Sequence, residues 1–243
     1  MLETITAAIF DVDGVLLASP HEQAWRDALK GFADPRRFTT AMYQADVAGK
    51  PREDGALAAL KALGVPDAEK HAAEYAANKQ KRLEELIAEG AVSAYPDALR
   101  FVGELKKIGL PMAVASSSMN ANAMLKNIRF SDDQSLLDVF TVNATGRKLK
   151  HGKPNPEIFL DAASDLKMPP ARCFVAEDAP AGIEAALAGG MFGLGVARHH
   201  DGTSLRKVGA DLVVTHLDQI DVAELAKGRV RRLVTDATGP RHG

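Results

Sequence analysis

The stretch "AAIFDVDGVLL", residues 7–17, decides the fold because it joins a buried strand to a pair of acidic side chains. Its first four residues are apolar, as is typical of a strand buried inside a sheet. Asp11 and Asp13 follow at once, with Gly14 directly behind them. Two carboxylates at one strand end raise each other's pKa unless a cation offsets their charge. The stretch therefore predicts a cationic partner, either from another part of the chain or from solution.

Similar apolar runs recur along the chain and alternate with helical patterns. The predicted strands lie at residues 6–12, 111–117, 172–178, 191–197 and 210–215. The predicted helices lie at residues 96–108, 119–128, 155–167 and 180–189. Buried strands that alternate with helices indicate an α/β fold with a Rossmann-like, mostly parallel sheet covered on both faces. In such a sheet the chemistry occurs beyond the carboxyl ends of the strands.

Residues 19–90 have a different character from the rest of the chain. They are rich in Ala, Leu, Glu and Lys, contain no convincing strand, and are interrupted by Gly- and Pro-containing breaks. This composition predicts a small α-helical domain inserted after the first strand, with residues 1–18 and 91–227 forming the α/β core domain. Residues 228–243 are basic and weakly patterned, which predicts a disordered tail.

Composition and charge exclude several classes of protein. A net charge of −2 and a pI of about 6.4 argue against nucleic acid as a partner. The chain has no apolar run of about eighteen residues, so no membrane partner is expected. The first residues lack a signal-peptide pattern and the single Cys173 allows no intrachain disulfide, so a cytoplasmic protein is expected. The adjacent His199 and His200 predict an exposed loop rather than a metal site, because neighbouring side chains point apart on an extended chain.

Acidic and hydroxyl side chains gather at the predicted strand ends. They are Asp11, Asp13, Ser116, Ser117, Ser118, Glu177 and Asp178. Four converging carboxylates repel one another, and Mg²⁺ prefers oxygen ligands, so these acids predict a Mg²⁺ site. A site of this kind suggests phosphate chemistry. Ser116 and Lys153 add the hydroxyl donor and the cation that the charged oxygens of a phosphoryl group require.

Four motifs carry a family resemblance. They are "DVDGV" at 11–15, "VASSS" at 114–118, "GKPNPEIF" at 152–159 and "AEDAPAGIEAALAGG" at 176–190. In order and spacing they resemble the four motifs of the haloacid dehalogenase superfamily of phosphohydrolases, and the match covers nearly the whole chain. The resemblance implies that the α/β core is a haloacid dehalogenase core, that the inserted helical region is its small cap domain, and that the activity is phosphoryl transfer.

The resemblance also implies a role for each motif residue. Asp11 is expected to attack phosphorus and form an aspartyl phosphate, while Asp13 acts as general acid and base. Lys153 is expected to neutralise charge on the nucleophile and the phosphoryl group. Ser116 and Ser117 are the expected phosphate-binding hydroxyls. The expected Mg²⁺ ligands are Asp11, Asp13, Glu177 and Asp178.

Shorter segments of the inserted region resemble the β-phosphoglucomutase subgroup of this superfamily. They are "HEQAW" at 21–25, "GKPRED" at 49–54 and "NKQKRLEELI" at 78–87. This resemblance implies that Arg52 binds the non-reacting phosphate of a sugar bisphosphate and that Lys79 is a second cation for the same substrate. His21 is expected to assist proton handling by Asp13, and Asn120 to position a substrate phosphate.

Two departures from the subgroup leave the reaction open. Ala18 stands where the subgroup often has an aspartate, and Met119 where it often has a phosphate-binding lysine. The favoured hypothesis is Mg²⁺-dependent phosphoryl transfer on a small phosphorylated sugar, as in a β-phosphoglucomutase. A sugar-phosphate phosphatase of broader specificity and a non-catalytic phosphate-binding scaffold are the alternatives.

Overall fold

Six parallel strands form the central sheet of the structure, a computed structural model that describes residues 4–198 and 202–234. In spatial order the strands are β5 (Val142–Asn143), β4 (Met112–Val114), β1 (Ala7–Phe10), β6 (Cys173–Glu177), β7 (Phe192–Val196) and β8 (Leu212–Val214). Neighbouring strands pair in parallel throughout. The α/β fold with a parallel sheet is therefore confirmed, and all five predicted strands form. The edge strand β5 was not predicted, because two residues are too short a run to show a hydrophobic pattern.

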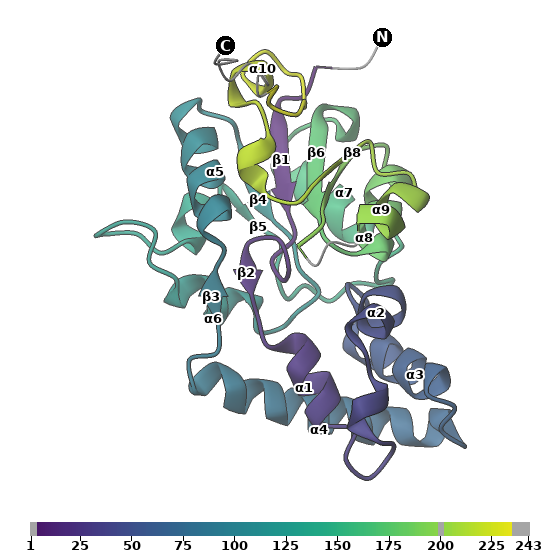
Figure 1. Ribbon diagram of the computed structural model, residues 1–243. Helices are drawn as coiled ribbons and strands as arrows, with labels where there is room; N and C mark the ends of the chain where they lie inside the picture. The colour runs from purple at the N-terminus through teal and green to yellow at the C-terminus, as the bar shows by residue number, and fades with distance from the viewer. Residues whose placement is uncertain (1–3, 199–201, 235–243) are drawn as a thin grey trace, which may run out of the picture.

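Helices pack around the sheet and cover both of its faces (Figure 1). They are α5 (Pro96–Lys107), α6 (Ala121–Asn127), α7 (Glu157–Asp165), α8 (Pro180–Ala188), α9 (Gly202–Lys207) and α10 (Val222–Leu225). Alternate residues of β1 enter two different apolar clusters, since successive side chains of a strand point to opposite faces. Phe10 packs with Phe101 on one face, and Ile9 lies in the cluster of Phe159 on the other. The predicted burial of both faces is confirmed.

A helical insert lies beyond the carboxyl ends of the core strands (Figure 1). Its helices are α1 (His21–Asp27), α2 (Thr40–Met42), α3 (Arg52–Ala62) and α4 (Ala68–Ala88), with short helical turns at Pro35–Arg37 and Tyr43–Val47. The insert has its own apolar core, which includes Trp25, Leu29 and Tyr75. The predicted helical character of residues 19–90 is confirmed, whereas the domain limits placed at 1–18, 19–90 and 91–227 stay a prediction.

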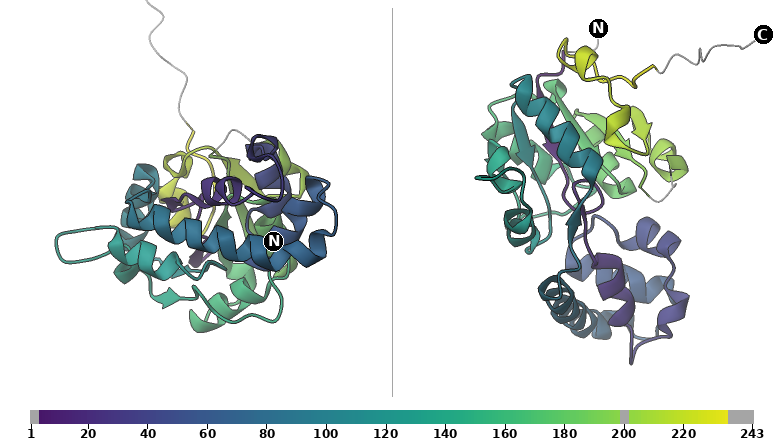
Figure 2. Two further views of the ribbon diagram at one scale, coloured as in Figure 1. Left: turned by 90° about the horizontal axis from the view of Figure 1, so that it is seen from below. Right: turned by 60° about the vertical axis from the view of Figure 1, so that its left-hand side comes forward.

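Two short antiparallel strands connect the insert to the core. They are β2 (Leu17–Ala18), which leads into α1, and β3 (Ser93–Ala94), which follows α4. Figure 2 shows this connection between the sheet and the helical insert. Because β2 follows β1 closely in the chain and pairs with β3, both connections leave the core at the carboxyl end of β1, and the insert lies over that end of the sheet.

Residues 228–234 of the segment predicted to be disordered instead pack against the core. The backbone N–H of Ile5 donates to the Gly228 carbonyl at 3.0 Å, and that of Leu233 donates to the Gln219 carbonyl at 2.7 Å. Arg232 forms an isolated bridge with Ile220. The rest of the predicted tail, residues 235–243, and the predicted loop at His199 and His200 lie outside the described residues.

The helices of the described residues include none that is both long and apolar enough to cross a membrane. The longest of the helices given above, α4, has 21 residues but carries charged side chains along its length.

Candidate active site

The strand order brings the predicted acidic and hydroxyl residues to one end of the sheet. β1 is central and pairs with β4 on one side and β6 on the other. Asp11 therefore lies between Ser116, which follows β4, and Glu177, which ends β6. The backbone N–H of Asp11 donates to the Ala176 carbonyl at 3.0 Å, which continues the strand pairing up to Asp11. The acidic and hydroxyl residues that follow the parallel strands therefore lie together at one edge of the sheet, as predicted.

Lys153 supplies the cation for this cluster from the loop before α7. Its Nζ donates to Asp11 Oδ1 at 2.5 Å and to Glu177 Oε1 at 2.5 Å, and the Lys153 side chain is 1% exposed. Burial raises the pKa of Asp11 to about 7, although Lys153 acts in the opposite direction. Burial, together with Glu177 and Asp11, also holds the pKa of Asp178 well above its usual value. The cluster therefore contains more negative charge than Lys153 alone offsets.

The same cluster fits a divalent cation. Asp11, Glu177 and Asp178 each place one carboxylate oxygen within 4.8 Å of the others. Three carboxylates and one ammonium leave two negative charges uncompensated, which matches one divalent cation with oxygen preference. Both Glu177 oxygens are already engaged, because Oε2 accepts from the Ala179 N–H at 2.9 Å and Oε1 binds Lys153. Asp11 and Asp178 therefore keep more unengaged carboxylate oxygens than Glu177, and Asp13, which was also expected as a ligand, lies outside this group.

Gly182, at the start of α8, leaves the space in which the Glu177 carboxylate lies. A Cβ at this position would be 1.9 Å from Glu177 Oε1. We expect Gly182→Ala to displace Glu177 from Lys153 and to lower the free energy of unfolding by about 1–3 kcal/mol, the usual cost of overpacking. Urea denaturation measures the change.

Gly103→Ala in α5 is the matched control for Gly182→Ala. Its nearest neighbour would be the Phe130 ring at 3.7 Å, so the new methyl group fits. In a helix interior this substitution is expected to raise stability by about 0.5–1 kcal/mol. A Gly182→Ala protein that is as stable as Gly103→Ala would contradict the assignment of close packing around Glu177.

Asp13 lies at the boundary between core and insert, next to His21. His21 Nε2 is 3.6 Å from Asp13 Oδ1 and 3.4 Å from Ser118 Oγ. On its other side, His21 Nδ1 is 3.1 Å from Lys79 Nζ. Asp13 Oδ1 is buried and has no hydrogen-bond partner within the described structure. The structure thus brings the predicted residues Asp13, His21 and Lys79 together, with His21 between the other two. Asp13 Oδ1 remains available to a ligand.

Burial changes the pKa values of His21 and Lys79. It lowers the pKa of His21 to about 4, so the imidazole is neutral near pH 7. It lowers the pKa of Lys79 from its usual 10.5 to about 8, and the neighbouring charge of Arg52 acts in the same direction. Lys79 is 3% exposed, and its Nζ lies 4.9 Å from the Trp25 ring centre. An ammonium ion inside the insert therefore destabilises the folded protein at neutral pH, which indicates a role other than stability.

The Lys79→Met variant is expected to be more stable than wild type at pH 7 by about 1–3 kcal/mol, because it removes a buried charge. Between pH 8 and 10.5 the unfolded wild type holds a proton that the folded protein has lost, so wild-type stability rises with pH across this range. The difference in free energy of unfolding between the variant and wild type should therefore decrease as the pH rises. Urea denaturation at pH 7, 9 and 10.5 measures it, with Lys81→Met, on the exposed face of α4, as control. A pH-independent gain would contradict the assigned pKa of Lys79.

A cavity of about 760 Å³ lies between the core and the insert and contains most of the predicted site. The predicted residues that line it are Asp11, Asp13, His21, Arg52, Lys79, Ser116, Ser117, Lys153 and Asp178. The insert closes tightly on the core beside it, since a Cβ at Gly152 would be 2.0 Å from Pro51 Cγ. The cavity is therefore a site whose substrate contacts come from both parts of the chain.

Two of the predicted residues do not line the cavity. Asn120 does not line the cavity, and its Oδ1 accepts a hydrogen bond from Gln80 at 3.4 Å. Glu177, predicted as a metal ligand, is fully buried, contacts Lys153 and lies in the acidic cluster with Asp11 and Asp178. Met119, where the subgroup often has a lysine, is 67% exposed at the cavity wall.

Sequence reasoning missed several residues that line the cavity. They are Tyr43, Gln44, Lys50, Tyr95, Lys148 and Lys150. The basic run "GRKLKHGK", residues 146–153, was a usable signal for the last two, because its cations directly precede Lys153. Tyr43 and Gln44 gave no such signal, since they lie in a short helical turn of the insert with no recognisable motif.

The comparisons with known proteins agree with this geometry. A family model described as haloacid dehalogenase-like hydrolase matches residues 5–190. The β-phosphoglucomutase of Bacillus subtilis (strain 168) is 34% identical over 217 residues, which cover 86% of this chain and 88% of that protein. A phosphorylated carbohydrates phosphatase of Thermotoga maritima is 30% identical over 213 residues, 86% of this chain and 93% of that protein.

The solved structures give the same result. The crystal structure of an archaeal β-phosphoglucomutase from Pyrococcus sp. strain ST 04 is similar with a TM-score of 0.72 and 31% identity, over 90% of this chain and 96% of that one. Family model, relatives and structure cover both the core motifs and the insert. The chain belongs to the haloacid dehalogenase-like hydrolase family and, within it, to the β-phosphoglucomutase-like subgroup of phosphatases and phosphomutases.

Proposed function

We propose that the chain catalyses Mg²⁺-dependent phosphoryl transfer on a small phosphorylated sugar, with Asp11 as the nucleophile. The observation that carries the proposal is the position of Asp11, which is held by Lys153 and faces a cavity that Ser116 and Arg52 also line. A phosphoryl group beside Asp11 meets a cation and a hydroxyl donor there, as transfer requires. The names of the relatives, β-phosphoglucomutase and phosphorylated carbohydrates phosphatase, support a sugar phosphate as substrate.

The reaction has two steps in which bonds and protons balance. In the first, an Asp11 oxygen bonds to phosphorus while the bond from phosphorus to the sugar oxygen breaks, and protonated Asp13 gives its proton to that oxygen. In the second, a hydroxyl group of the sugar or a water molecule bonds to phosphorus and gives its proton to Asp13. The Asp11 carboxylate is released in the same step, which restores the enzyme.

Mg²⁺ fits the residues that are present. Asp11 and Asp178 would hold it with their carboxylate oxygens, while Glu177 holds Lys153 in place. When bound, the ion supplies positive charge to the phosphoryl oxygens. Membership of an enzyme family and the buried excess of carboxylates both argue against a non-catalytic scaffold, since binding phosphate alone does not require a nucleophile beside the anion.

Two observations bear on the choice between mutase and phosphatase. Arg52 and Lys50 line the cavity from the insert, where they suit a second phosphate of a bisphosphate, and this favours the mutase. Met119 places an uncharged side chain at the same cavity where the subgroup often has a lysine, and this favours the phosphatase as the second candidate. The core residues serve both reactions equally, because the nucleophile is the same.

The test follows both products of one substrate. The protein is incubated with β-glucose 1-phosphate, MgCl₂ and a catalytic amount of β-glucose 1,6-bisphosphate, and glucose 6-phosphate and inorganic phosphate are measured together. Glucose 6-phosphate without phosphate release supports the mutase. Release of phosphate from this and other sugar phosphates supports the phosphatase. Activity that persists in EDTA, or no turnover of any sugar phosphate, would overturn the proposal.

A further inference from the structure

Arg198, two residues beyond the end of β7, binds three acceptors from two separate segments. Its Nη2 donates to the Val15 carbonyl at 2.8 Å, and its Nε donates to the Gly14 carbonyl at 3.3 Å. Its Nη1 donates to Asp97 Oδ2 at 2.5 Å. The side chains of Arg198 and Asp97 are 4% and 6% exposed. The ion pair is therefore buried, and its geometry is determined by the surrounding structure.

The two carbonyl groups belong to the loop that carries Asp13. Gly14 directly follows Asp13, and the Gly14 N–H donates to the Leu17 carbonyl at 2.9 Å, which closes the loop. Asp13 Oδ1 is buried and accepts no hydrogen bond within the described structure. His21 Nε2, at 3.6 Å from that oxygen, is too far away for a hydrogen bond. The orientation of Asp13 therefore depends on its backbone, which Arg198 holds at the next two residues.

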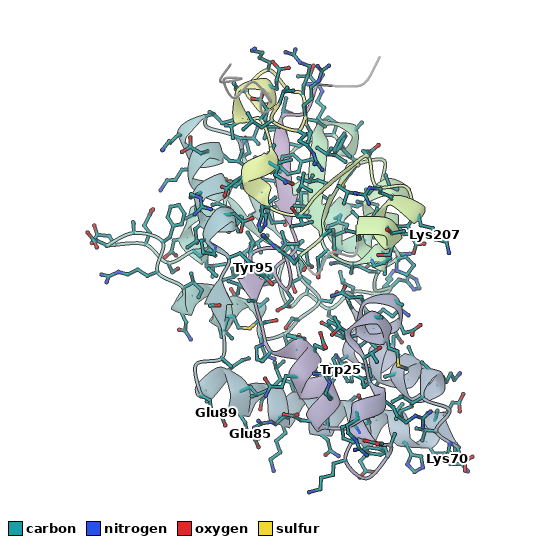
Figure 3. All side chains as sticks on the ribbon, in the orientation of Figure 1. Trp25, Lys70, Glu85, Glu89, Tyr95 and Lys207 are labelled. Carbon is teal, nitrogen blue, oxygen red and sulfur yellow. The ribbon has the colours of Figure 1, made fainter. Side chains whose placement is uncertain are left out.

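The same guanidinium group contacts the second connection to the insert. Tyr95 directly follows β3, and its ring centre lies 4.0 Å from Arg198 Cζ. The Tyr95 N–H donates to the Leu16 carbonyl at 3.0 Å, which ties the two connections together. Figure 3 shows Tyr95 at the level where the core meets the insert. Asp97, at the start of α5, also accepts from the Leu217 N–H at 2.7 Å and thereby joins the pair to the core.

We propose that Arg198, held by Asp97, is a positioning residue for Asp13 and fixes the core ends of both connections to the insert. The inference rests on the proposed function, in which Asp13 protonates the leaving sugar oxygen. A planar guanidinium offers five donors in a fixed fork and can hold two carbonyls and a carboxylate at once. A lysine ammonium group at the same place keeps the charge but cannot reach all three acceptors.

The experiment compares two substrates that differ in their need for a general acid. In single-turnover reactions, nitrophenolate leaves 4-nitrophenyl phosphate without a proton, whereas the sugar oxygen of β-glucose 1,6-bisphosphate requires one. We expect Arg198→Lys to lower the single-turnover rate with the sugar bisphosphate about 10- to 100-fold, which is part of the rate enhancement that a general acid contributes. The rate with 4-nitrophenyl phosphate should fall less than about threefold. Asp13→Asn should show the same pattern more strongly.

Arg100→Lys is the matched control. Arg100 in α5 also binds an aspartate, Asp218, through two nitrogens, but this pair lies at the surface with 60% and 46% of the side chains exposed. Its rates with both substrates should equal those of wild type. Equal losses on both substrates in Arg198→Lys, or no loss on either, would overturn the positioning role.

Hydrogen exchange provides a readout that needs no turnover. Peptides that cover residues 12–18 and 93–97 should exchange faster in Arg198→Lys than in wild type, while peptides from α4 should not change. Unchanged exchange in both segments would overturn the inference. A wild-type protein that reacts with neither substrate would overturn the proposed function and the part of the inference that concerns Asp13, and the exchange data alone would then decide whether Arg198 holds the loop.

Discussion

The Asp11→Asn variant is expected to consume β-glucose 1,6-bisphosphate at least about 10⁴-fold more slowly than wild type, because loss of a nucleophile removes the covalent route. Asparagine has nearly the same shape, and Lys153 still has Glu177 as a partner, so the fold should persist. The measurement is single-turnover release of product in the presence of MgCl₂. A second measurement traps the aspartyl phosphate with hydroxylamine, and the variant should yield none.

The control for this variant is Asp132→Asn, whose side chain is 97% exposed in the loop after α6. It removes one carboxylate far from the cavity and should leave the rate unchanged. A loss of less than about tenfold in Asp11→Asn, with the covalent adduct still present, would show that a different side chain attacks phosphorus.

The Lys153→Met variant is expected to lose about 3–5 kcal/mol of stability, the usual cost of removing one partner from a buried ion pair. Asp11 and Glu177 would then remain side by side, buried and without the ammonium group that now contacts both. Catalysis should fall as well, because the charge next to the phosphoryl group is lost. Urea denaturation without added metal measures the stability, and turnover of 4-nitrophenyl phosphate measures the activity.

Lys107→Met is the control for the lysine substitution. Lys107 pairs with Glu104 on the surface of α5 and is 73% exposed, so its loss should change stability by less than about 1 kcal/mol. If Lys153→Met were as stable as Lys107→Met, the three-residue cluster would not be the strongly coupled unit that its distances indicate.

The fold and the core of the site could be read from local patterns. Each of the five predicted strands is a short apolar run bounded by polar residues, and burial on both faces of a parallel sheet requires that composition. Once the strands are parallel, the residues after them must share one edge of the sheet. Asp11, Ser116 and Asp178 could therefore be placed together from the sequence, and the family motifs identified the same three residues.

Long-range pairings and strand lengths could not be predicted in this way. Glu177 was expected as a metal ligand, and it lies in the acidic cluster with Asp11 and Asp178. Its carboxylate also binds Lys153 and the Ala179 N–H, which the sequence did not predict. Asn120 was expected at the substrate, and its Oδ1 accepts a hydrogen bond from Gln80 of α4, which the sequence did not predict. Neither outcome has a local signal, because the partners come from distant parts of the chain or from backbone atoms.

The α/β class, the helical insert and the acidic edge of the sheet could be derived from the sequence alone, because each depends on residues close together in the chain. The tertiary structure was needed to show that Lys153 binds both Asp11 and Glu177, that Lys79 is buried, and that Arg198 holds the loop of Asp13. These features depend on atoms brought together from segments far apart in sequence; Val15 and Arg198, for example, have a sequence separation of 183. Hydrophobic patterns specify which side of a strand or helix is buried, but the geometry of a buried charge depends on every neighbour that surrounds it.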